Sequence, residues 1–188
     1  MRTASVAFLV LSLAVWSGCG ALAADGLDKA VAACWACHGA GAAPKDGSIP
    51  VIQGQQAGYL EKQLHEFRSG QRDDQIMSSM AESIPPKETA RAAALIAALP
   101  WPKIPAAPGA PEPDSLVACR SCHGADLMGG PGPEGVAPRL SGQFSDYLEA
   151  QMGVFARGER ASAKTMTATM QSLDAAERAR LAKYLAGL

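Results

Sequence analysis

Two short stretches, Cys34-Trp35-Ala36-Cys37-His38 and Cys119-Arg120-Ser121-Cys122-His123, decide how this chain is built. Each stretch offers two thiols one helical turn apart, followed directly by an imidazole. This spacing suits thioether bonds from both cysteines to the vinyl groups of a haem, with the histidine as the proximal iron ligand. The sequence therefore predicts two covalently bound haem c groups, with His38 and His123 as metal ligands.

Two other chemistries use cysteine pairs of this spacing. Two Cys-x-x-Cys knuckles can share one zinc ion, but here each knuckle repeats together with its own complete domain. Exported cysteines can also form disulfides or a thioredoxin-like redox pair. That interpretation requires a βαβ pattern that the sequence lacks, and it leaves both adjacent histidines unexplained, so haem attachment is favoured.

The chain around these motifs is an internal repeat. Three segments recur in order: residues 49–55 as 137–143, Tyr59-Leu60-Glu61 as Tyr147-Leu148-Glu149, and Gly70-Gln71-Arg72 as Gly158-Glu159-Arg160. Such self-similarity is typical of duplicated structural units, and it predicts homologous domains over residues 25–99 and 114–188. The segment between them, residues 100–113, contains six prolines. Because proline fixes φ and removes a donor, this segment is expected to be an extended, semi-rigid linker.

Apolar residues recur at helical spacing within each domain. The stripes are Tyr59, Leu60, Leu64 and Phe67 in the first domain, and Tyr147, Leu148, Met152 and Phe155 in the second. Further helices are expected to lead into each motif, from Leu27 and from Ser115. The closing helices are expected over 90–99 and 173–188, with Ser172 or Asp174 as a cap for the second. The predicted fold class is all-α: two tandem helical domains with long Gly/Pro loops and no strand.

Residues 1–24 have the features of a secretory signal peptide. Arg2 supplies a positive charge, an apolar stretch follows, and Ala21-Leu22-Ala23 forms a cleavage signal. The apolar stretch is too short to span a membrane, so a periplasmic protein is expected. Cys19 offers an alternative, because it could be lipidated and leave the protein membrane-associated. Trp16 is a poor residue three positions before such a cysteine.

Composition and charge narrow the possible partners. The 17 basic and 18 acidic residues leave a net charge of −1, and no basic patch indicates nucleic-acid binding. Aromatic residues make up 5% of the chain, against 19 glycines and 13 prolines. So few large aromatic side chains are available that two hydrophobic cores are hard to fill with side chains alone. A large apolar cofactor bound in each domain would fill the remaining space.

A six-coordinate haem needs an axial ligand on its second face. The one remaining histidine, His65, corresponds to Gly153 in the second repeat and lies in an amphipathic helix, so it is predicted to be a surface residue. Methionine is the other ligand type available. Met77 and Met166 stand at equal spacings before the closing helix regions and are the predicted distal ligands. The nearby Met80 and Met170 stand at unequal spacings before these helix regions and are expected to line the haem pockets.

The repeat also predicts groups around the ligands. The carbonyls of Pro50 and Pro138 are placed to accept a hydrogen bond from the proximal imidazoles, as metal-bound histidines usually require. Arg72 and Arg160 occupy equivalent positions in the two repeats and are candidates to pair with haem propionates. The alternative is that both are surface residues.

With these motifs in place, the chain resembles dihaem c-type cytochromes of the cytochrome c4 family over nearly all of residues 25–188. The resemblance implies two class I cytochrome c folds face to face, with iron ligands His38, Met77, His123 and Met166. It also implies a periplasmic location and electron delivery from a quinol-oxidising complex to a terminal oxidase or another acceptor. The linker and the glycine-rich loop 126–135 depart from the family pattern and affect only the expected domain packing.

The expected function is electron transfer without catalysis. Thioether ligation raises the haem potential and closes the iron to other ligands, and no acid/base constellation accompanies the haem motifs. One alternative is an electron-transfer subunit of an exported oxidoreductase, such as a dehydrogenase or a thiosulfate-oxidising complex. A second alternative, a dihaem peroxidase, requires a haem with an open or displaceable ligand.

Overall fold

The computed structural model describes residues 19–105, 110–160 and 162–188, with side chains from residue 28 onward. Most of the predicted signal peptide therefore lies outside the described residues, as does the side chain of Cys19. Residues 19–24 form the start of the first helix. Across the described residues, no helix combines the length and the apolar character needed to cross a bilayer.

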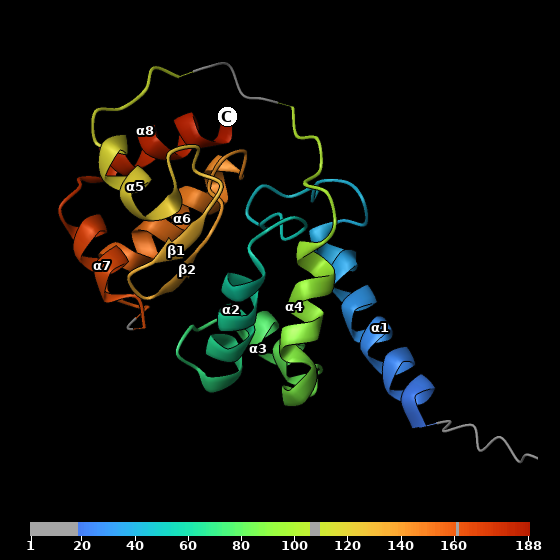
Figure 1. Ribbon diagram of the computed structural model, residues 1–188. Helices are drawn as coiled ribbons and strands as arrows, with labels where there is room; N and C mark the ends of the chain where they lie inside the picture. The colour runs from blue at the N-terminus through green and yellow to red at the C-terminus, as the bar shows by residue number, and fades with distance from the viewer. Residues whose placement is uncertain (1–18, 106–109, 161) are drawn as a thin grey trace, which may run out of the picture.

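The helices form two groups that lie side by side (Figure 1). The first group comprises α1 (Cys19–His38), α2 (Ala57–Ser69), α3 (Gln75–Glu82), the 3-10 turn η1 (Pro86–Glu88) and α4 (Thr89–Ala97). The second comprises α5 (Leu116–His123), β1 (Gly130–Gly132), β2 (Gly135–Ala137), α6 (Ser145–Ala156), α7 (Lys164–Gln171) and α8 (Ala175–Ala186). The predicted all-α class of two tandem helical domains is confirmed.

Each group has its own core, built on the predicted apolar stripes. Leu60, Leu64 and Phe67 of α2 pack with buried residues of α1, α3 and α4. Leu148, Met152 and Phe155 of α6 pack in the same way with buried residues of α5, α7 and α8. Helix α2 ends where Gly70 adopts a left-handed conformation with φ of 73°, which glycine reaches at no steric cost.

The closing helices begin and end close to the expected residues. Helix α4 starts one residue before the predicted segment 90–99, and α8 starts two residues into the predicted segment 173–188. Asp174 is the N-cap of α8, because its side chain accepts a hydrogen bond from the Glu177 N–H. Ser172, the other candidate cap, lies at the end of α7 instead.

The prediction that no strand forms is wrong for the loop after the second motif. Residues 130–132 pair antiparallel with residues 135–137 to form a two-stranded hairpin. This hairpin lies against α2 of the first group: Gly58 faces Val136, whose Cγ2 would be 2.8 Å from a Cβ at residue 58, and Lys62 Nζ donates to the Glu134 carbonyl at 2.9 Å. Three-residue strands rich in glycine carry little apolar alternation, so only tertiary contact reveals them.

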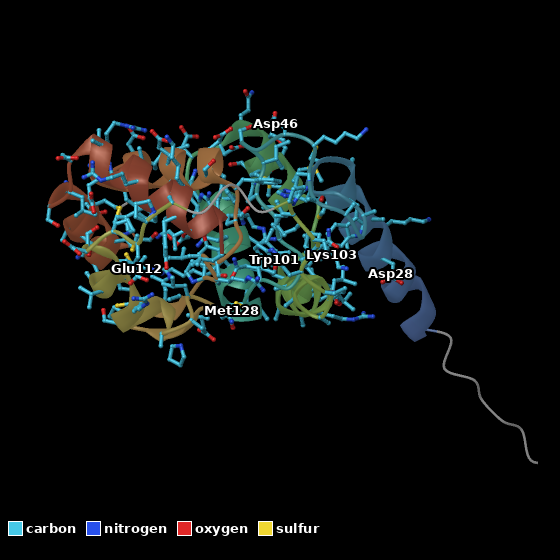
Figure 2. All side chains as sticks on the ribbon, turned by 90° about the horizontal axis from the view of Figure 1, so that it is seen from above. Asp28, Asp46, Trp101, Lys103, Glu112 and Met128 are labelled. Carbon is cyan, nitrogen blue, oxygen red and sulfur yellow. The ribbon has the colours of Figure 1, made fainter. Side chains whose placement is uncertain are left out.

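The proline-rich segment places one aromatic residue between the two groups. Residues 100–105 have no regular structure. They include Trp101, which is labelled in Figure 2. The guanidinium of Arg139 stacks on the Trp101 ring, 4.1 Å from the ring centroid. The Trp101 backbone also lies close to Gly54 of the first domain. A Cβ at residue 54 would be only 3.0 Å from the Trp101 backbone nitrogen. The start of the linker is therefore packed against both domains.

Candidate haem-binding sites

Both motifs lie at the carboxyl end of a helix. Helix α1 ends at His38 and α5 ends at His123. The glycine after each histidine has a positive φ, 78° at Gly39 and 85° at Gly124, a conformation that favours glycine. A Cβ at Gly39 would lie 2.3 Å from the Ala42 carbonyl oxygen. The chain therefore turns sharply after each imidazole and leaves it at the boundary between helix and loop.

The two imidazoles are held in the same way. His38 Nδ1 lies 2.7 Å from the Pro50 carbonyl oxygen, and His123 Nδ1 lies 2.8 Å from the Pro138 carbonyl oxygen. A carbonyl oxygen only accepts, so Nδ1 carries the proton and the lone pair is on Nε2. Burial lowers the pKa of both imidazoles, partly offset by the hydrogen bonds to the prolines. Each histidine is thus neutral and oriented, as an iron ligand must be.

The cysteines of both motifs are unpaired thiols. Cys37 is exposed and the other three are half-buried: Cys34, Cys119 and Cys122. Burial raises the pKa of Cys34 and of Cys119. Each helix therefore presents two thiols one turn apart beside a buried imidazole. This arrangement fits the donor set of a haem c, with two attachment points and one axial ligand per domain.

The predicted distal methionines occupy matching places. Met77 is the third residue of α3 and Met166 the third residue of α7. Each is half-buried at the edge of its own core. Their neighbours do not match, because Met170 is 1% exposed within the core whereas Met80 is half-buried. The assignment of Met77 and Met166 as ligands stays a prediction, and their equivalent positions support it.

His65 lies away from both sites. Its side chain is 53% exposed, and its Nε2 is 3.9 Å from Glu61 Oε1 on the next turn of α2. The predicted surface position of His65 is confirmed.

A buried glutamine that sequence reasoning missed supports the first site. Gln53, 1% exposed, donates from Nε2 to the carbonyls of Gly39 at 2.7 Å and Ala42 at 3.1 Å. It thereby fixes the loop that follows His38. The second repeat has Ser141 at this position, so the internal comparison carried no signal for it.

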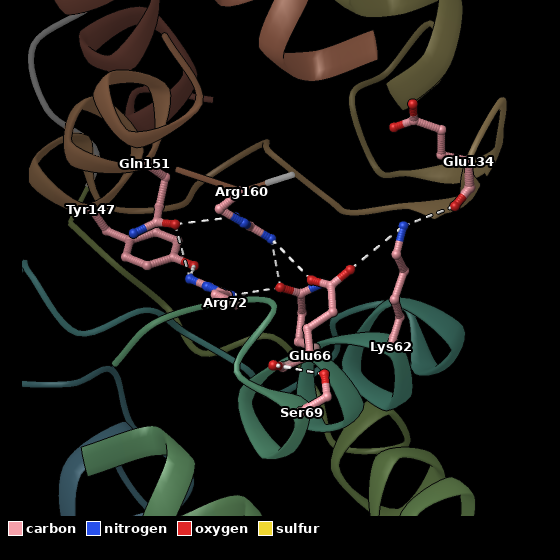
Figure 3. A network of polar contacts seen from close by, with 9 residues as sticks. Lys62, Glu66, Ser69, Arg72, Glu134, Tyr147, Gln151 and Arg160 are labelled. Carbon is pink, nitrogen blue, oxygen red and sulfur yellow. Dashed lines mark hydrogen bonds and ion pairs between the residues drawn. The ribbon is translucent and has the colours of Figure 1, made fainter. Parts of the chain in front are cut away.

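Arg72 and Arg160 lie between the two domains. They are 8% and 3% exposed, so the alternative that they are surface residues is wrong. Each guanidinium stacks on an aromatic ring of its own domain, Arg72 on Phe67 and Arg160 on Phe155. Figure 3 shows how they join the domains. Arg72 donates to Gln63, Tyr147 and Gln151, and Arg160 donates to Gln151 and Gln63.

One carboxylate accompanies these two guanidiniums. Glu66, 3% exposed, accepts from Gln63 Nε2 at 2.9 Å, and its Oε2 lies 3.7 Å from Arg160 Nη2. The corresponding residue of the second repeat is Val154, so the two guanidiniums outnumber the buried carboxylate. Arg160 Nε is buried without a hydrogen-bond partner among the described residues. Among these three buried residues one positive charge is in excess, and Glu66 Oε1 also has no hydrogen-bond partner among the described residues. Asp73, Asp74 and Glu159 line the cavity beside the two arginines.

Known proteins are similar to this chain over both of its domains. The family model described as cytochrome c matches residues 115–188. A thiosulfate dehydrogenase electron acceptor from Stutzerimonas stutzeri is 32% identical over 174 residues, which cover 84% of this chain and 79% of the relative. A cytochrome c4 from Thiocapsa roseopersicina is 31% identical over 183 residues, covering 85% of this chain and 89% of the relative.

A solved structure has the same fold over both domains. The cytochrome c4 of Acidithiobacillus ferrooxidans superposes with a TM-score of 0.72 at 26% sequence identity, covering 84% of this chain and 99% of that one. The arrangement of two tandem helical domains therefore matches in both sequence and structure.

Proposed function

Because the chain belongs to the cytochrome c4 family of dihaem electron carriers, we propose that it shuttles electrons in the periplasm between a quinol-oxidising complex and a terminal oxidase or another acceptor. The observation that carries this proposal is the duplicated imidazole arrangement. Each domain holds one buried, neutral histidine whose Nδ1 is bonded to a proline carbonyl, at 2.7 Å and 2.8 Å. Two such sites in one chain suit stepwise transfer of single electrons.

The residues of each site have separate tasks. Cys34 and Cys37 attach the first haem and His38 binds its iron, while Cys119, Cys122 and His123 do the same for the second. A bound haem supplies a reversible one-electron change between ferric and ferrous iron. The carbonyls of Pro50 and Pro138 hold the imidazole planes and raise their basicity.

Met77 and Met166 complete the coordination from α3 and α7. A thioether ligand favours the reduced iron and excludes exogenous ligands, which suits a carrier and disfavours a peroxidase.

Arg72 and Arg160 pair with haem propionates in this proposal. The unused donor Nε of Arg160 supports it, because a guanidinium is well matched to a carboxylate.

Spectra of the purified protein test the carrier function. We expect two covalently bound haems per chain, low-spin absorption in both oxidation states, a methionine–iron charge-transfer band and no binding of carbon monoxide. Carbon monoxide binding to either ferrous haem would instead indicate an open coordination site and an enzyme.

A second candidate partner is a thiosulfate dehydrogenase, and the similarity to an electron acceptor of that enzyme favours it. Stopped-flow reduction by a purified thiosulfate dehydrogenase with thiosulfate, compared with reduction by a quinol-oxidising complex, separates the two roles. Fast reduction by only one donor identifies the physiological branch.

Processing and domain limits belong to the same proposal. Residues 1–24 are removed on export, and residues 25–99 and 114–188 form the two haem domains on either side of the linker 100–113. Mass spectrometry of the exported protein tests this: a chain beginning at Asp25 with two haems is expected, whereas a lipid-modified Cys19 would show a membrane anchor.

A further inference from the structure

Two glutamines cross the domain interface in a reciprocal way. Gln143 of the second domain accepts the Val51 N–H at 3.0 Å through Oε1 and donates from Nε2 to the Val51 carbonyl at 2.9 Å. Gln55 of the first domain accepts the Arg139 N–H at 2.7 Å and donates to the Arg139 carbonyl at 3.0 Å. Each side chain therefore binds both backbone polar groups of one residue in the other domain.

The residues they bind are next to the histidine partners. The N–H of Val51 and the C=O of Pro50 belong to one peptide group, and that carbonyl accepts from His38 Nδ1. In the second domain, the N–H of Arg139 shares its peptide group with the carbonyl that accepts from His123. A continuous chain of hydrogen bonds thus runs from each imidazole, through one peptide, to a glutamine of the opposite domain.

We propose that Gln55 and Gln143 are positioning residues for the haem of the opposite domain, so that each haem potential depends on an amide supplied from across the interface. This inference rests on the proposed histidine ligation. Hydrogen bonds in series polarise one another, so the glutamine oxygen makes the proline carbonyl a stronger acceptor. A stronger acceptor makes the imidazole a better electron donor to iron, which stabilises ferric iron and lowers the potential.

The setting of both glutamines favours a fixed geometry. Gln143 is 3% exposed and Gln55 is 5% exposed, and a buried amide is costly to leave without partners. The orientation of each amide is also set from its own domain: Gln143 Oε1 accepts from the Phe144 N–H at 3.1 Å, and Gln55 Oε1 accepts from the Gln56 N–H at 2.9 Å. The same arrangement occurs in both repeats.

Crossed single substitutions test this proposal in the intact dihaem protein. Gln143→Leu removes both interdomain hydrogen bonds, together with the bond from the Phe144 N–H, with little change in volume. Gln55→Leu does the same for the other contact, where the bond lost within the domain is that from the Gln56 N–H. Redox titration followed by NMR resolves the two haems, since only the first motif contains a tryptophan, Trp35, for assignment. We expect Gln143→Leu to raise the potential of the haem at His38 more than that at His123, and Gln55→Leu to give the reverse.

Amide exchange supplies a readout that does not depend on haem chemistry. Gln143→Leu is expected to speed exchange of the Val51 amide about tenfold, the effect of losing one buried hydrogen bond, while the Arg139 amide keeps its protection. If haem ligation were wrong but the contact real, the exchange result would persist without the crossed potentials. The two failures are therefore distinguishable.

Two further variants sharpen the test. Gln56→Ala removes another interdomain bond, from Nε2 to the Met128 carbonyl at 2.8 Å, without touching either proline loop, and should leave both potentials unchanged. Gln143→Glu keeps the accepting oxygen, so the potential of the haem at His38 should not rise, even if the leucine variant fails to fold. Equal shifts of both haems in every variant, or a larger shift in the haem of the substituted domain, would overturn the proposal.

Discussion

At the scale of single residues, the two halves of the chain use different side chains to reach one geometry. His38 and His123 have matching hydrogen bonds to proline carbonyls, yet Gln53, which supports the loop after His38, is replaced by Ser141 in the second repeat. The hydrogen bond of the motif histidine is therefore duplicated more faithfully than the residue that holds the following loop.

The methionine assignment leads to a prediction at this scale. Met166→Ala should leave the second haem without its thioether ligand, so that about half of the haem absorption becomes high-spin and the potential of that haem falls. Visible spectra and redox titration measure both effects.

Met128→Ala is the matched control, because Met128 is 36% exposed in the loop before the hairpin. It should leave spectra and potentials unchanged. A Met166→Ala protein that stayed low-spin with an unaltered potential would refute the assignment.

At the scale of elements, the carboxyl end of the linker is tied to two helices. Glu112 accepts from Arg120 of α5, at 3.0 Å between Oε2 and Nη2, and from the Tyr184 hydroxyl of α8 at 2.8 Å. These hydrogen bonds, that of Arg120 first, lower the pKa of Glu112 from 4.5 to about 2. The ionised carboxylate therefore joins the linker to the second haem motif and to the closing helix.

The stability contributed by Glu112 should depend on pH. Because the pKa is lower in the folded state, the contribution is fully present above about pH 4.5 and is lost as the pH falls towards about 2. Glu112→Gln should lower the thermal midpoint modestly at pH 7, with the difference from the parent shrinking across this window. The Glu112 side chain is 46% exposed, so added salt should reduce the effect.

Glu149→Gln, an exposed glutamate of α6, is the control and should show no such pH-dependent difference. A difference for Glu112→Gln that stayed constant from pH 7 to pH 2 would contradict an ionic contribution.

The elements also show what could be predicted from sequence. The helices that carry the motifs, the apolar stripes of α2 and α6 and the closing helices follow from local pattern, and all are present. Helices α3 and α7 are not among the predicted elements. Each is eight residues long and packs against the long helix before it, α2 or α6, and so short a helix is marginal without tertiary packing. The contacts of Arg72 and Arg160 across the interface could not be predicted, because the repeat shows which residues match and not which face meets the other domain.

At the scale of the whole molecule, the domains share a buried polar interface rather than a simple apolar one. The guanidinium of Arg160 lies 3.7 Å from the carboxylate of Glu66, and the side chains of both residues are almost fully buried. Removing one partner of such a pair leaves a charge buried without compensation. The interface is therefore sensitive to single substitutions that keep each domain core intact.

Arg160→Ala should reduce the free energy of unfolding by about 3 kcal/mol, measured by urea denaturation of the dihaem protein. Arg157→Ala removes a nearby arginine that pairs with Glu159 at the surface, and should change stability by less than about 0.5 kcal/mol. Equal effects of the two substitutions would argue against an energetic role for the buried pair.

The reciprocal glutamine contacts affect how such a protein can diverge over evolutionary time. Gln55 and Gln143 bind only main-chain atoms of their target residues. One target, Arg139, has a long charged side chain, and the other, Val51, has a short apolar one. Mutations at the target positions can therefore accumulate without removing these hydrogen bonds. Two descendants of one ancestral gene could lose most of their recognisable similarity at this interface and still dock their halves in the same way.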